Sequence, residues 1–153
     1  MNQTFNARHI FYISLMALFM LGCGFFGSAA QERLEDNERV FGGTKLGKVV
    51  MAEGVGSQNT PVGVTNSFSS SQDFIYVVAE AEQIEAGTSL FARWSKDGEP
   101  FEDSSEVVAD RDYENTYVEF HLENLTDSMD EGDYSVQIFV NGNPAEEVEF
   151  TVQ

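Results

Sequence analysis

An acidic stretch near the end of the chain has residue types and spacing that could hold a metal ion. Residues 127–134 read DSMDEGDY, and their carboxylates are potential calcium ligands: Asp127, Asp130, Glu131 and Asp133. Calcium takes oxygen ligands at alternating positions around a tight turn. Met129 stands where an EF-hand-type loop would have its second ligand, and no D-x-D-x-D-G pattern occurs. Calcium is therefore a weak candidate, and we predict that the protein needs no cofactor.

The same stretch fits a turn that begins a β-strand. Gly132 supplies a turn conformation that a side chain would hinder. Asp130 accepts backbone N–H groups of the turn. We favour this structural interpretation over the calcium site.

Groups suited to catalysis are scarce. Beyond residue 22 the one histidine is His121, which lies on the outward face of an expected strand between two glutamates. A zinc site needs several His or Cys ligands, and a Ser-His-Asp triad would lack the glycines of a nucleophile elbow. The chain has no complete P-loop motif. We predict that the protein is not an enzyme.

A short apolar run near the start of the chain is typical of a signal peptide. The run IFYISLMALFML, Ile10–Leu21, begins shortly after Arg8. Gly22 and the only cysteine, Cys23, follow it directly. Its 12 residues are too few to cross the ~30 Å hydrocarbon core of a bilayer as a helix. They suit the apolar core of a signal peptide, which we assign to residues 1–22.

The four residues MLGC resemble the lipobox of bacterial lipoproteins, L-[AS]-[GA]-C. Gly22 and Cys23 match the pattern, whereas Met20 and Leu21 depart from it. The resemblance implies that Cys23 becomes the mature N-terminus and carries acyl chains such as palmitate, which anchor the protein in a membrane. Gly24 follows the cysteine, and by resemblance to enterobacterial sorting this favours the outer membrane of the cell envelope. The alternative is simple secretion, with cleavage after Ala30.

The segment after the cysteine is predicted to be a flexible tether. Residues 23–47 are small and polar at first, then charged, and finally glycine-rich. The composition changes at Lys48, so we place one domain at residues 48–153. With no cysteine beyond Cys23, this domain has no disulfide, and its stability depends on its core.

The chain is strongly acidic. Residues 1–22 contain Arg8 and no acids, so the mature chain would have 7 basic and 26 acidic residues, a formal charge of −19. Such a surface repels nucleic acid and anionic lipid headgroups, and we expect no nucleic-acid partner. Diffuse acidity is typical of a solvated surface, and the alternatives are a divalent cation or a basic partner.

Alternation of apolar and polar residues predicts an all-β domain of about seven short strands. Leu90, Ala92 and Trp94 share one face of SLFARWS, and Val118, Phe120 and Leu122 share one face of TYVEFHLENL. DYSVQIFV and EEVEFTV alternate in the same way. The pairs Asp97-Gly98 and Asn141-Gly142 predict tight hairpin turns. We predict an antiparallel β-sandwich with no long helix after Lys48.

The pattern resembles the immunoglobulin-like fold. That family has a Trp on its third strand and a D-x-G-x-Y-x-C run at its sixth, which Trp94 and Asp130, Gly132 and Tyr134 reproduce. Val136 stands at the second cysteine position, and Val77 or Ala79 at the first. Lacking both cysteines, the chain is closer to bacterial Ig-like or fibronectin-III-like modules. The resemblance implies that Tyr134 is a tyrosine corner, whose ring enters the core and whose hydroxyl bonds the backbone a few residues upstream. The resemblance says little about function.

Two aromatic residues point away from the predicted inner faces. Phe91 is on the opposite face of its strand from Leu90 and Trp94. Phe139 is on the opposite face of its strand from Ile138 and Val140. On neighbouring strands they would form an apolar patch for a partner, unless the tether or the Thr60–Phe68 loop covers them. We therefore predict a non-catalytic, membrane-anchored protein that binds an unidentified protein partner or supports assembly. The alternatives are a calcium-dependent adhesion or stability module, and an accessory or inhibitor domain of an enzyme.

Overall fold

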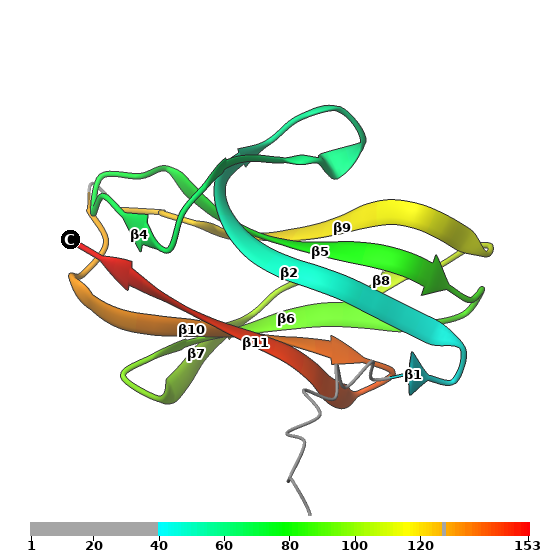
Figure 1. Ribbon diagram of the computed structural model, residues 1–153. Helices are drawn as coiled ribbons and strands as arrows, with labels where there is room; N and C mark the ends of the chain where they lie inside the picture. Colours follow the sequence, from blue (N-terminus) through cyan, green and yellow to red (C-terminus); the bar gives the residue numbers. More distant parts are fainter. Residues whose placement is uncertain (1–39, 127) are drawn as a thin grey trace, which may run out of the picture. The chain divides into compact units, whose positions relative to one another are not determined.

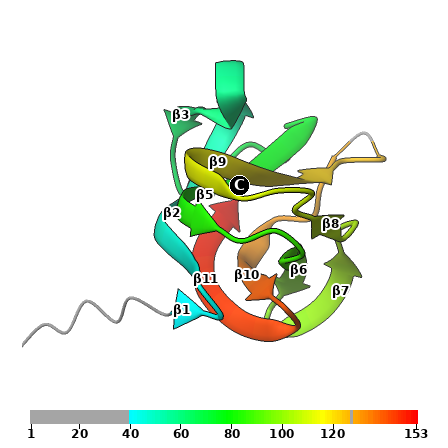
Figure 2. The same cartoon turned by 90° about the vertical axis from the view of Figure 1, so that its right-hand side faces the viewer.

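A computed structural model describes residues 40–126 and 128–153 of the chain, with side chains from Gly42 onward. These residues form two β-sheets that face each other, and one 3-10 turn, η1, at Ser57–Asn59 (Figures 1 and 2). The signal peptide at residues 1–22, the acylation site Cys23 and the calcium candidate Asp127 lie outside the described residues. Within the described ranges, no helix has the length and apolar content required to span a bilayer.

The first sheet has five strands in the order β1-β2-β5-β9, with β3 pairing on β2. All of its pairings are antiparallel. The strands are β1 (Val40–Phe41), β2 (Thr44–Val55), β3 (Pro61–Val64), β5 (Phe74–Ile84) and β9 (Tyr113–Glu123).

The second sheet has six strands in the order β4-β11-β10-β6-β7, with β8 pairing on β6. The short strand β4 pairs with β11 in parallel, and the other pairings are antiparallel. The strands are β4 (Ser67–Phe68), β6 (Ser89–Lys96), β7 (Glu99–Asp103), β8 (Val107–Val108), β10 (Gly132–Val140) and β11 (Asn143–Val152).

The predicted all-β sandwich is confirmed at this level, but the predicted number of strands is wrong. The structure has eleven strands in its described residues, where the sequence predicts about seven. Three of the additional strands, β1, β3 and β4, have two to four residues, too few for alternation to be visible. The fourth, β7, is exposed along its whole length, so it lacks an apolar face.

Both predicted hairpin turns are present. Asp97 and Gly98 join β6 to β7 with φ of 50° and 81°, and Asn141 and Gly142 join β10 to β11 with φ of 51° and 75°. Positive φ at both central positions gives a turn whose twist matches that of the strands beside it.

The folded domain begins before Lys48, where the sequence analysis placed its start. Strand β2 starts at Thr44, and a turn at Gly42 and Gly43 pairs it with β1. Both glycines have positive φ, at 61° and 97°, so residues interpreted as flexible form a tight hairpin. The Thr44 hydroxyl is buried and lies 2.8 Å from that of Thr88, which fixes this end of β2 to the start of β6.

The core lies between the sheets and contains the predicted inner faces of the strands. Trp94 is fully buried and packs edge-on against Phe150, with 6.0 Å between ring centroids. Tyr134 stacks on the same ring at 5.3 Å, so Phe150 connects the tryptophan to the tyrosine. The buried apolar residues of the β6, β10 and β11 faces are Leu90, Ala92, Trp94, Tyr134, Val136, Ile138, Val140, Phe150 and Val152.

Candidate interaction surface

The two outward phenylalanines lie side by side on the outer face of the six-stranded sheet. Phe91 of β6 and Phe139 of β10 are directly opposite each other in the antiparallel register. Their rings are stacked with 4.5 Å between centroids and 4° between planes. Both are half-buried, so each keeps part of its ring in contact with solvent. The structure thus brings together the two residues that the sequence placed on neighbouring strands.

A cation lies beside this aromatic pair. The Arg93 guanidinium carbon is 5.2 Å from the centroid of Phe139 and 5.9 Å from that of Phe91. Its Nε and Nη2 donate to the two carboxylate oxygens of Asp103 on β7, at 2.7 and 2.8 Å. The hydrogen bond to Arg93 lowers the pKa of Asp103, and the same bond raises the pKa of the guanidinium. The pair therefore holds Arg93 in place across neutral and mildly acidic pH.

The Thr60–Phe68 loop does not cover the aromatic pair. Within this loop β3 pairs with β2, in the other sheet. Strand β4 pairs with Thr151 and Val152 at the end of β11, whereas Phe139 is opposite Pro144 near its start. The tether residues 24–39, the other expected cover, lie outside the described residues. Among the described elements, the stack remains part of the surface.

The acidic stretch before β10 forms a turn that begins the strand, as the structural interpretation of the sequence predicts. The Tyr134 hydroxyl donates to the carbonyl of Asp130 at 2.7 Å, four residues upstream, while its ring is buried. Gly132 has φ of +146°, and a Cβ there would lie 3.3 Å from Cε of Lys96. Among the described residues, the Asp130 carboxylate does not accept the backbone N–H groups expected of it. It is largely exposed and pairs with Lys96 Nζ at 3.3 Å, because Lys96 is opposite Tyr134 on β6.

The calcium candidates do not converge in the described residues. No group of three or more His, Cys, Asp or Glu side chains there is arranged to hold a metal ion. The Asp130 carboxylate pairs with Lys96, and among the described residues Asp130, Glu131 and Asp133 do not form a group that could hold an ion.

We expect millimolar calcium and EDTA to leave the melting temperature unchanged to within about 1 °C. A ligand that binds the native state alone must raise the melting temperature, and the candidate carboxylates among the described residues do not converge, so we expect no shift. Differential scanning calorimetry in the presence of each reagent measures this directly. A rise of several degrees in calcium, reversed by EDTA, would show that a site forms around this turn.

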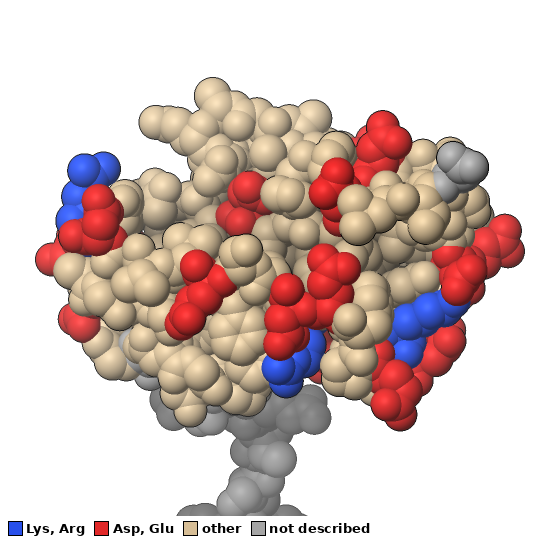
Figure 3. All heavy atoms as spheres, turned by 180° about the vertical axis from the view of Figure 1, so that it is seen from behind, with Lys and Arg blue, Asp and Glu red and all other residues tan. Residues whose placement is uncertain are grey.

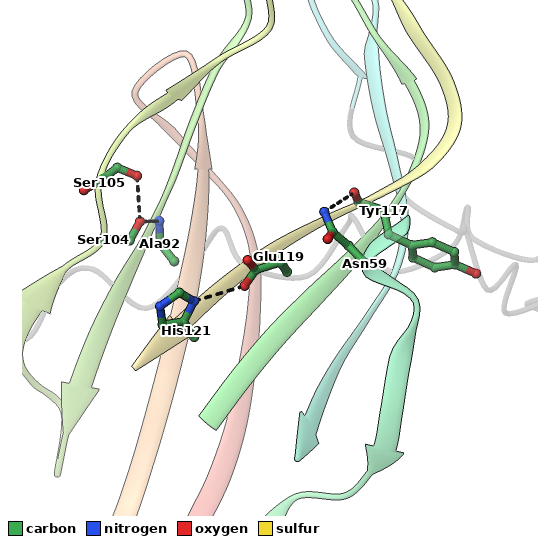
Figure 4. A network of polar contacts seen from close by, with 7 residues as sticks. All are labelled: Asn59, Ala92, Ser104, Ser105, Tyr117, Glu119 and His121. Carbon is green, nitrogen blue, oxygen red and sulfur yellow. Dashed lines mark hydrogen bonds and ion pairs between the residues drawn. The ribbon is translucent and has the colours of Figure 1, made fainter. Parts of the chain in front are cut away.

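His121 is part of an aromatic cluster on the outer face of the five-stranded sheet. Its ring centroid is 5.4 Å from that of Tyr76 and 5.6 Å from that of Phe74. Its Nδ1 lies 3.2 Å from the Glu119 carboxylate (Figure 4). The sequence analysis took this histidine as a solvated strand residue. The cluster was missed because it depends on the pairing of β5 with β9, which puts Tyr76 opposite His121.

Sequence reasoning also missed an uncharged lobe. The connection from β2 through η1 to β3 projects above the five-stranded sheet, and residues 54–72 contain no Asp, Glu, Lys or Arg. In Figure 3 carboxylates are spread over the face in view, whereas the lobe at its top has no charged side chain. Val62 and Val64 on β3 are more than half exposed. The signal available in the sequence was the long interval without charge in so acidic a chain.

A shallow depression of about 710 Å³ lies over the ends of β10 and β11. Its lining includes four acidic residues, Asp97, Asp133, Glu147 and Glu149. It is next to the acidic turn, and its charge would repel anions.

Comparisons with known proteins leave the family of this chain undefined. No family model matches the chain, and no curated protein matches it. Among solved structures it is similar to the alkylpurine DNA glycosylase AlkC of Pseudomonas fluorescens, with a TM-score of 0.40 and 12% identity over 72% of this chain. This chain spans 30% of the AlkC chain. It is also similar to a superoxide reductase (neelaredoxin) from Ignicoccus hospitalis, with a TM-score of 0.38 and 17% identity, over 58% of this chain and 76% of that one.

Proposed function

We propose that this protein is a non-catalytic binding or assembly module, anchored to the bacterial cell envelope by an acylated Cys23. A protein partner contacts the outer face of the six-stranded sheet. The observation that carries the proposal is the stacked pair Phe91 and Phe139, which lies beside Arg93 on the paired strands β6 and β10. Phe and Arg are enriched in the cores of protein–protein interfaces relative to the rest of the protein surface.

We further propose that the domain is immunoglobulin-like. Strands β2, β5 and β9 lie in one sheet and β6, β10 and β11 in the other, the division expected of strands A, B and E against C, F and G. Val77 and Val136, at the positions of the family's two cysteines, are fully buried and belong to opposite sheets. Fully buried Trp94 on β6 and the bond of Tyr134 to the carbonyl of Asp130 support the same assignment.

The proposed location rests on the sequence. The apolar run before Gly22 and Cys23 is followed by residues of tether-like composition, so the domain would stand a short distance from the membrane. We propose the outer membrane because Gly24 follows the cysteine. The net charge of −19 of the mature chain, 7 basic against 26 acidic residues, keeps the body of the protein off anionic headgroups.

Replacing Phe139 with serine is expected to abolish capture of a stoichiometric partner from detergent-solubilised membranes. The substitution removes one half of the aromatic stack, and its position on the surface leaves the fold intact. The matched control is Val62→Ser, which removes an exposed apolar side chain from β3 in the other sheet. Affinity purification followed by quantitative mass spectrometry measures the partner. If Val62→Ser lost the partner and Phe139→Ser retained it, the partner would bind the uncharged lobe and not the aromatic pair.

A further inference from the structure

Strand β9 forms an edge of the five-stranded sheet. It pairs with β5 along its length and with no other strand in the part of the chain that the structure describes. The Tyr117 carbonyl accepts a hydrogen bond from the side chain of Asn59 in η1, at 3.5 Å (Figure 4). Because that carbonyl already accepts a bond, the part of this 11-residue edge strand that can pair with a further strand through its backbone N–H and C=O groups lies beyond Tyr117, toward Glu123.

The side chains of β9 select which strand can pair there. Glu119 and Glu123 lie on its outer face, opposite Val78 and Phe74 of β5, so neither faces a basic residue across that ladder. His121 lies between the two glutamates on this face of the strand, and its Nδ1 is 3.2 Å from the Glu119 carboxylate. Residues of an added strand would lie directly opposite these side chains, with Cβ atoms about 4.5–5.5 Å away. Lys or Arg there would be attracted, and Asp or Glu would be repelled.

The charge of the whole molecule disfavours a second copy of this chain as the occupant. A second copy of this chain would bring another net charge of −18 to the edge, and like charges directly opposite destabilise a strand pair. A basic segment would be attracted both by the glutamates directly opposite it and, at longer range, by the acidic surface as a whole.

Apolar side chains lie on the same side of the sandwich as this edge. Val107 and Val108 of β8 are about half exposed, at 49% and 59%, and residues 109–112 connect β8 to the start of β9. Successive side chains of a strand point to opposite faces. The side chains of an added strand that face away from Glu119 and Glu123 would therefore point toward the β8 side. An apolar residue at those positions would cover surface that is now exposed to water.

We propose that the edge of β9 beyond Tyr117, where Glu119 and Glu123 lie, is a site for strand addition by an extended segment of another protein that alternates Lys or Arg with apolar residues. Backbone hydrogen bonds to β9 supply affinity, and cation–carboxylate pairs at Glu119 and Glu123 supply specificity. This site goes beyond the proposed function, because it lies on the opposite sheet from Phe91 and Phe139.

The test uses the full-length protein in neutral detergent and a short synthetic peptide that alternates lysine with valine. Binding is measured by titration calorimetry, and backbone protection by hydrogen exchange with mass spectrometry. We expect the peptide to bind and to slow amide exchange in residues 113–123. We expect Glu119→Lys with Glu123→Lys to weaken binding about tenfold or more, and the milder pair Glu119→Gln with Glu123→Gln to weaken it less.

Three controls separate strand addition from general attraction between opposite charges. Glu147→Lys with Glu149→Lys makes the same change of charge on exposed residues of β11 and should weaken binding less than about threefold. A peptide with proline in place of valine keeps its charge but cannot form a ladder, and it should not bind. Phe139→Ser should leave peptide binding unchanged, so the failure of this proposal is distinguishable from that of the proposed function.

Equal loss of binding in the β9 and β11 variants, or binding of the proline peptide, would overturn the proposal in favour of nonspecific electrostatics. Absence of binding at millimolar peptide, with the variants folded by circular dichroism, would also overturn it. A dimer that dissociates with Glu119→Lys would identify a second copy as the occupant and would contradict the proposal.

Discussion

Replacing Trp94 with alanine is expected to lower the free energy of unfolding by about 3–5 kcal/mol, a large part of the stability of a domain of this size. The side chain is fully buried, and it packs against Phe150 at the centre of the core. With Cys23 as the only cysteine, no disulfide compensates for the cavity that remains. Urea denaturation followed by circular dichroism measures the change.

The matched control is Trp94→Phe. The indole Nε1 is buried and has no hydrogen-bond partner among the described residues, so phenylalanine removes a polar group that contributes no bond. We expect this variant to lose less than half the stability that the alanine variant loses, because most of the ring remains. Equal losses in the two variants would show that the indole N–H, and not the volume of the ring, stabilises the core.

Replacing Cys23 with serine is expected to abolish the incorporation of labelled palmitate. Serine lacks the thiolate that accepts the lipid, and the chain has no second cysteine. Labelling of cells that express the protein, followed by immunoprecipitation, gives an all-or-none result. The matched control is Ala30→Glu, which blocks the alternative cleavage after Ala30 and should leave labelling unchanged. A chain that is unlabelled in its natural form, and that accumulates as a precursor with Ala30→Glu, would establish simple secretion.

The sequence was sufficient to predict the features that depend on local pattern. Alternation identified the inner faces of β6, β10 and β11, because each strand has one buried face. Asp97-Gly98 and Asn141-Gly142 identified two hairpins, because these residues tolerate positive φ. Gly132 and Tyr134 identified the turn before β10 through the bond to a nearby carbonyl.

Features that depend on contacts between distant segments could not be predicted. Gly42 and Gly43 have the composition of a linker, and they form a hairpin because Thr44 and Leu46 are buried against later strands. Asp130 pairs with Lys96 because a turn and a strand far apart in the sequence are adjacent.

The candidate interaction surface also combines features that local pattern predicts with features that depend on contacts between distant segments. Its two phenylalanines were identified from alternation alone, since each stands out of phase with a buried face. Their stacking, and the position of Arg93 beside them, required the register of β6 against β10. The side chain of Asp103, which holds that arginine, belongs to a strand that alternation did not reveal.

The most direct test of the proposed binding surface is cross-linking in intact cells from a photoreactive phenylalanine analogue at position 139. The account predicts one discrete product that contains a single partner protein. The same probe at Lys48, an exposed position on β2 in the other sheet, should give no such product. The same product from both positions, or a product from Lys48 alone, would contradict the account.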